Sequence, residues 1–86
     1  MQHMLMNQLE LKTAVEAALK GDWHAAHNIA QEYSDGTANW IHAVLHKIEG
    51  DAWNSRYWYA RGTGHTYEDF ADSTLELKAI LETLES

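Results

Sequence analysis

The sequence predicts a single all-α domain, residues 1–86, with two helical hairpins and a longer C-terminal helix. The chain has no proline and is rich in alanine, leucine, glutamate and lysine, which favour helices. Apolar residues recur at helical spacing along most of its length. Two Gly-Asp pairs, Gly21-Asp22 and Gly50-Asp51, interrupt this pattern, as expected where a glycine ends one helix and an aspartate caps the next.

The first hairpin is expected to begin at Asn7, which forms a capping-box pattern with Glu10 and leaves residues 1–6 as a frayed end. The helix that follows has its apolar face at Leu11, Ala14, Val15 and Ala18. The second helix begins after Asp22, and its predicted buried side holds Trp23, Ala26, Ile29, Ala30 and Tyr33. Residues 34–37 are typical of a turn.

The second hairpin is expected to place one helix at residues 38–49 and another from Asp51 to about Arg61. The first of these is predicted to bury Trp40, Ile41, Val44, Leu45 and Ile48. Thr66 and Asp69 then indicate the start of the C-terminal helix. Its apolar residues alternate steps of four and three, at Phe70, Thr74, Leu77, Leu81 and Leu84.

The two Gly-Asp pairs suggest an internal repeat with an offset of 29 residues, from Gly21 to Gly50. The same offset aligns Ala26 with Ser55, so a small residue in each hairpin would let its two helices approach closely. Two such units and a final helix resemble a short tetratricopeptide-like stack, although this repeat is shorter and lacks that family's consensus. The likeness concerns architecture.

The stretch from Trp40 to Arg61 reads Trp-Ile-His-Ala-x-Leu-His-x-x-Glu-Gly-Asp-x-x-Asn-x-Arg-Tyr-Trp-Tyr-x-Arg. This pattern resembles the core of a family of short, uncharacterised bacterial and fungal proteins. Upstream, Asp22-Trp23 and the pattern Ala-His-x-Ile-Ala-Gln from Ala26 resemble that family's preceding block. The resemblance covers about half of the chain; it implies an all-helical fold and assigns no activity.

Composition excludes several classes of partner. Thirteen acidic and six basic residues give a net charge of −7, which opposes binding to nucleic acids and to anionic membrane surfaces. No apolar run approaches the roughly 20 residues needed to span a bilayer. Without cysteine the chain has neither disulfides nor thiolate metal ligands, which favours a cytoplasmic location.

His42 and His46 are four residues apart, so they share a helix face, and Glu49 is expected beside them on the side away from the core. A His pair at this spacing is a common zinc chelate, and His27 or His24 could add a ligand from the preceding helix. The alternative is that the two histidines pair with carboxylates or pack against a neighbouring helix. His27 is in either case expected to be a partly buried, hydrogen-bonded imidazole.

Aromatic residues occupy nearly all sides of the helix after Asp51. Trp58 and Tyr59 lie near Ser55 and are expected to face the preceding helix. Trp53 and Tyr57 point elsewhere, so either the C-terminal helix covers them or they form an exposed anchor for a partner. Arg56 is expected to pair with a carboxylate; the alternative is that it holds an anionic ligand group beside these rings.

The sequence therefore favours a small soluble binding or interaction module without catalysis or a cofactor, acting on a protein partner or as a homodimer. No serine or cysteine nucleophile has a base at a recognisable spacing. The alternative is a domain that binds zinc, another divalent metal or a small ligand, and such a domain could also be an enzyme. The candidate binding residues are His27, His42, His46, Glu49, Trp53, Arg56 and Tyr57.

Overall fold

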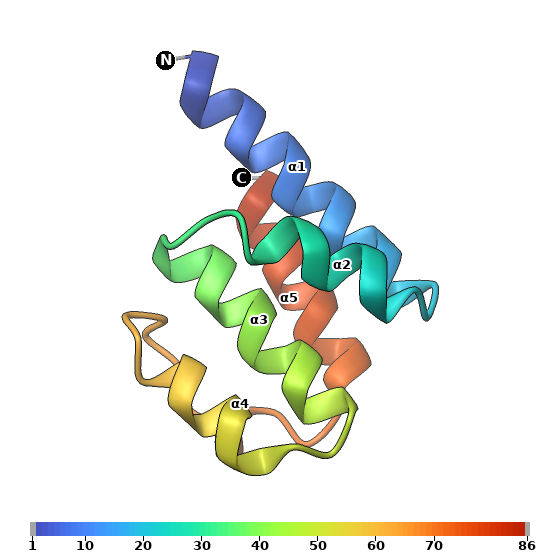
Figure 1. Cartoon of the computed structure of the whole chain (residues 1–86), viewed down its shortest axis with the longest axis vertical. Coiled ribbons are helices and arrows are strands. Elements are labelled where there is room, and N and C mark those ends of the chain that lie inside the picture. Colours follow the sequence, from blue (N-terminus) through green and yellow to red (C-terminus); the bar gives the residue numbers. More distant parts are fainter. Residues whose placement is uncertain (1, 86) are drawn as a thin grey trace.

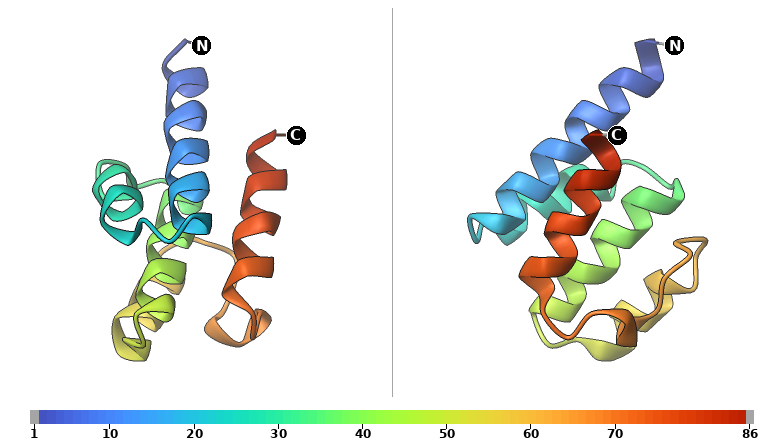
Figure 2. Two further views of the ribbon diagram at one scale, coloured as in Figure 1. Left: turned by 90° about the vertical axis from the view of Figure 1, so that its right-hand side faces the viewer. Right: turned by 180° about the vertical axis from the view of Figure 1, so that it is seen from behind.

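The computed structural model describes residues 2–85, with side chains from residue 7 onward. This part of the chain forms α1 (Gln2–Leu19), α2 (Trp23–Ala30), α3 (Gly36–Ile48), α4 (Ala52–Tyr59), the 3-10 turn η1 (Tyr67–Asp69) and α5 (Ser73–Glu85), without strands. The pairs α1–α2 and α3–α4 are helical hairpins, and α5 packs against α1 and α3 (Figures 1 and 2). The predicted all-α bundle is confirmed. None of the described helices combines the length and the apolarity needed to cross a membrane.

Both Gly-Asp pairs form the predicted turns. Gly21 and Gly50 have φ angles of +87° and +82°, in the left-handed region that glycine adopts without strain. Asp22 and Asp51 each accept a hydrogen bond from the backbone amide three residues further on, and so cap α2 and α4. The two turns therefore share one local geometry, whereas the 29-residue repeat of whole hairpins stays a prediction.

Helix α3 is the centre of the bundle, because α1, α2, α4 and α5 all pack against it. Every residue from Ala38 to Leu45 is consequently buried, including His42, whose exposed fraction is 6%. The prediction that His42 lies on the side away from the core is therefore wrong, since α2 and α4 cover that side. Ile48 was expected to be buried and is instead exposed, because it lies in the last turn of α3.

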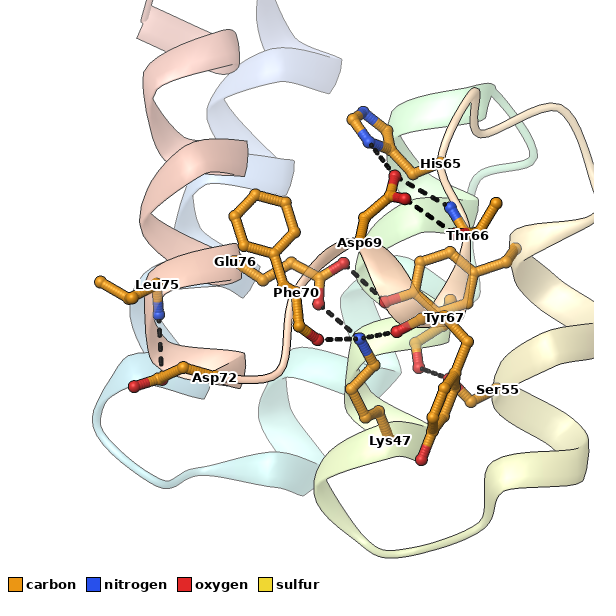
Figure 3. Close-up of polar contacts among 12 residues, drawn as sticks. Lys47, Ser55, His65, Thr66, Tyr67, Asp69, Phe70, Asp72, Leu75 and Glu76 are labelled. Carbon is orange, nitrogen blue, oxygen red and sulfur yellow. Dashed lines mark hydrogen bonds and ion pairs between the residues drawn. The ribbon is translucent and has the colours of Figure 1, made fainter.

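Three predicted helix starts also differ. Helix α1 begins at Gln2 rather than at Asn7, because the preceding Met, Leu and Gln residues favour a helix and no glycine or proline stops it. Asp35 caps α3, so residues 36 and 37 belong to that helix rather than to a plain turn. The capping box of Thr66 and Asp69 belongs only to η1. Asp72 instead caps α5, because its carboxylate accepts hydrogen bonds from the backbone amides of residues 74 and 75, the second of which Figure 3 shows.

The C-terminal helix is also not the longest. Helix α5 has 13 residues, as many as α3, whereas α1 has 18. Because α5 starts at Ser73, Phe70 lies outside it, and Thr74 is exposed. The predicted seam is therefore reduced to Leu77, Leu81 and Leu84, with Ile80 buried beside them. These residues pack against the other helices rather than against a coiled-coil partner within the described chain.

Glu76 fixes α5 to the bundle. Its side chain is fully buried, and its carboxylate accepts hydrogen bonds from Trp40 Nε1 at 2.8 Å, Tyr59 Oη at 2.5 Å and Lys47 Nζ at 2.8 Å. Burial, the hydrogen bond to Glu76 and the charge of that carboxylate raise the pKa of Tyr59 above its usual value, so this hydroxyl keeps its proton. One carboxylate thus joins α5 to both α3 and α4.

Lys47 extends this network to the loop before α5. Its ammonium group also donates to the carbonyl oxygens of Tyr67 at 2.9 Å and Phe70 at 3.1 Å, as Figure 3 shows. The three hydrogens of the ammonium group therefore have three acceptors, counting Glu76. The buried ion pair is satisfied on both sides.

We expect Glu76→Gln to reduce the free energy of unfolding by about 3–5 kcal/mol, because it leaves the buried Lys47 charge without its counter-ion. Lys47→Met combined with Glu76→Gln removes both charges and should recover part of this loss. Urea unfolding of the two variants and the parent measures both effects. A loss below about 1 kcal/mol for Glu76→Gln would show that the ion pair is not needed for stability.

Candidate metal centre

Three imidazoles meet between α2 and α3. His27 comes from α2, and His42 and His46 come from successive turns of α3. One ring nitrogen of each lies within 4.8 Å of those of the other two. Helix α2 can bring His27 this close because it packs through small residues, Ala26 and Ala30, which are both fully buried. The structure thus brings together the three histidines that the sequence singled out.

The closest approach is between His27 and His42. Their Nε2 atoms are 3.1 Å apart, and their rings are nearly perpendicular, at 89°. This distance fits an N–H group of one ring donating to the other. It also fits two nitrogens of one tetrahedral zinc ion, which are about 3.3 Å apart when each Zn–N bond is about 2.05 Å. The predicted hydrogen-bonded role of His27 between α2 and α3 is confirmed, and the geometry admits a metal as well.

His46 is oriented by Glu49. The Nδ1 atom of His46 lies 2.8 Å from Glu49 Oε1, so Nε2 is the nitrogen of this ring that does not take part in that contact. The sequence suggested Glu49 as a metal ligand, whereas its closest contact is with the imidazole. A carboxylate in this position fixes the ring's tautomer and makes the imidazole a stronger ligand. Glu49 is therefore an orienting partner of His46.

Two tryptophans enclose the cluster. The Trp23 ring stacks on His27 with centroids 4.7 Å apart, and Trp58 stacks on His42 at 3.9 Å. Trp23 is itself fixed by a hydrogen bond from Nε1 to the carbonyl oxygen of Leu45. These contacts restrict the orientation of His27 and His42. The two rings are therefore preorganised for binding a ligand.

Burial favours the uncharged form of His27 and His42. Removal from water lowers the pKa of His42 to about 4, and the neighbouring His27 and His46 contribute in the same direction. Burial also lowers the pKa of His27, again with a contribution from His46. At neutral pH the lone pairs of these two rings are therefore free to bind a cation, because protons do not compete for them.

Asp51 lies at the edge of this site. One carboxylate oxygen of Asp51, one of Glu49 and one nitrogen of His46 are within 4.8 Å of one another. The Asp51 carboxylate already accepts hydrogen bonds from the backbone amide and the side chain of Asn54, and these bonds lower its pKa. Asp51 therefore serves mainly as the cap of α4, as the sequence predicted.

The other candidate residues lie outside the cluster. Trp53 and Tyr57 stack on each other at 6.4 Å and are 76% and 46% exposed, so α5 does not cover them. Arg56 forms the expected ion pair with a carboxylate, that of Glu68, and its guanidinium lies over the Tyr67 ring. Trp58 and Tyr59 face the bundle as predicted.

The sequence did not identify Trp23 and Trp58 as walls of a site. The four-residue spacing of Trp23 and His27 was a usable signal, since it places both rings on one face of α2. No local signal could have revealed the stacking of Trp58 on His42, because these residues come from different helices.

No family model, curated protein or solved structure matches this chain. The resemblances to an uncharacterised helical family and to tetratricopeptide stacks therefore stay predictions. The function must be argued from the geometry of the site.

We expect the metal-free protein to lose stability as the pH falls from about 6.5 to 4. In this window the unfolded chain protonates residue 42 near its ordinary pKa of 6.5, whereas the folded protein binds that proton only near pH 4. The unfolded state thus binds more protons and is favoured as the pH falls. The full difference between the two pKa values corresponds to about 3 kcal/mol in the free energy of unfolding.

Urea unfolding between pH 7.5 and 4 in the presence of a chelator measures this effect. His42→Gln is the comparison, since its amide nitrogen can replace Nε2 but does not titrate in this range. Carboxylates titrate in both proteins. The difference between the two curves of unfolding free energy against pH therefore reports the contribution of His42. Parallel curves for parent and variant would contradict the expected role of His42.

Proposed function

We propose that this chain is a small metal-binding domain in which His27, His42 and His46 hold one divalent transition metal, with zinc as the first candidate. The observation that supports this most is the convergence of three imidazole nitrogens from two helices within 4.8 Å. Three histidines are a ligand set of zinc sites that keep one coordination position for another ligand.

A metal ion would satisfy this cluster better than the histidines satisfy one another. One hydrogen bond can join His27 to His42, but an N–H···N bond serves only two of three imidazoles. The third ring, His46, pairs with Glu49 through Nδ1, and its other ring nitrogen has no hydrogen bond to the other two histidines. A bound cation would accept all three lone pairs at once.

The charges around the cluster also favour a cation. The chain carries a net charge of −7, and the carboxylates of Glu49 and Asp51 lie beside His46. Lys47 is adjacent in sequence, but its ammonium group is turned to Glu76 on another side of α3. Imidazole ligands suit zinc, copper, nickel and cobalt, so these metals are the candidates.

Calorimetric titration of metal-free protein with Zn²⁺ tests the proposal. We expect one ion per chain and a melting temperature that rises with the zinc concentration, because the ion binds the folded state. His27→Gln should weaken binding by more than about 100-fold, beyond the 10–100-fold typical of losing an outer partner.

His24→Gln is the matched control for this experiment. His24 is also on α2, but it is exposed and contributes no nitrogen to the cluster. Its variant should bind zinc as the parent does. Absence of binding by the parent, or equal affinities of His24→Gln and His27→Gln, would reject the proposed metal centre.

A second function, binding to a second copy of this chain, is supported by the exposure of Trp53. A tryptophan exposed to 76% next to a half-exposed Tyr57 is typical of a contact surface, because aromatic anchors contribute strongly to association. This surface lies on α4 and includes neither His27 nor His46. The two functions are therefore compatible.

Sedimentation equilibrium at several protein concentrations tests the second function. We expect the mean mass of the parent to rise above that of the monomer, and Trp53→Ala to remain monomeric. Leu75→Ala removes a comparably exposed apolar side chain from α5 and serves as the control. A parent that stays monomeric throughout would exclude self-association through this surface.

A further inference from the structure

We infer that a metal ion at His27, His42 and His46 keeps one coordination position open to a small oxygen or nitrogen anion, so that the centre exchanges ligands rather than only supporting the fold. This inference rests on the proposed metal-binding function. It adds that the fourth ligand of the ion is a small anion that can exchange.

The first argument is the number of available ligands. Zinc in proteins takes four ligands, and among the described side chains three nitrogens converge at this point. Glu49 is used on Nδ1 of His46, and the Asp51 carboxylate caps α4 and binds Asn54. The fourth ligand must therefore come from solvent or from a bound molecule.

The second argument is that the fold has its own source of stability. Large apolar side chains from three different helices, Leu11, Ile41 and Ile80, are buried in one core. The Lys47–Glu76 pair joins α5 to α3 independently of the histidines. A structural zinc site, in contrast, is typical of small domains that cannot fold without the ion.

The third argument is access. His42 is almost fully buried, whereas His27 is partly exposed and the His46 side chain is 12% exposed. His42 therefore forms the base of the site, and the other two rings form its edge. Trp23 and Trp58 stack on His27 and His42, so they hold these ligands in place from the sides. The exposed parts of His27 and His46 therefore mark the side from which a small molecule would approach the ion.

The fourth argument is charge. Three neutral imidazoles leave the full double positive charge on the ion, whereas carboxylate or thiolate ligands would neutralise part of it. An ion with this charge binds anions by direct coordination, against the repulsion of the nearby Glu49 and Asp51 carboxylates, and lowers the pKa of a bound water to about 7. Hydroxide, small carboxylates and azide are members of the ligand class that this charge selects.

Substitution with Co²⁺ tests the inference on the full chain, because the visible spectrum of cobalt reports its coordination. We expect one Co²⁺ per chain with the intense absorption of a four-coordinate ion. Azide, and separately acetate, should change this spectrum in a saturable manner at constant pH. Glu49→Gln should weaken cobalt binding by about 10–100-fold but retain the response to azide, since the carboxylate acts through His46.

The outcomes distinguish the two proposals. A chain that binds no Co²⁺ or Zn²⁺ overturns both the metal-binding function and this inference. A chain that binds one Co²⁺ with a spectrum unaffected by either anion retains the metal-binding function and overturns the open position. Far-UV circular dichroism after chelation is the second measurement. A helical signal that persists supports the inference, and unfolding on removal of the metal overturns it.

Discussion

Burial of α3 on all sides is the constraint on which the rest of the structure depends. A helix surrounded by α1, α2, α4 and α5 cannot send its polar side chains to water, so each must find a partner within the protein. Trp40 and Lys47 reach Glu76 of α5, and His42 reaches His27 of α2. Even a backbone carbonyl of α3, that of Ala43, accepts an additional hydrogen bond from Ser55 of α4. The polar residues of α3 thereby link it to α2 and α5.

The two polar clusters around α3 differ in how completely they are satisfied. The ammonium group of Lys47 has three acceptors, and the Glu76 carboxylate has three donors. Such a network fixes the position of α5, and it has no capacity left for a ligand. The three imidazoles have instead one short contact among themselves and one with Glu49. This incomplete satisfaction, with His27 and His42 held by stacking on Trp23 and Trp58, is the physical basis of the metal-binding proposal.

The four tryptophans show how one residue type takes different roles in one small bundle. Trp40 donates its N–H to buried Glu76 and belongs to the core. Trp23 and Trp58 stack on imidazoles and restrict their orientation. Trp53 is largely exposed beside Tyr57. Helix α4 has aromatic residues on nearly all sides, and these include core, site and surface residues. Which role each residue takes depends on the helix that lies next to it.

The sequence by itself determined the helical class, the turns at Gly21 and Gly50, the caps at Asp22 and Asp51, and the shared face of His42 and His46. All of these depend on interactions between residues at most four positions apart, which composition and spacing record. The contact between Glu49 and His46 is equally local, since the two residues are three positions apart. Only the tertiary structure decided that the face carrying His42 is buried and that Trp58 stacks on His42. It also decided that Asp72, rather than Thr66, caps α5, which starts at Ser73, although both residues can cap a helix. These outcomes depend on which helices meet, and that choice follows from the packing of the whole chain.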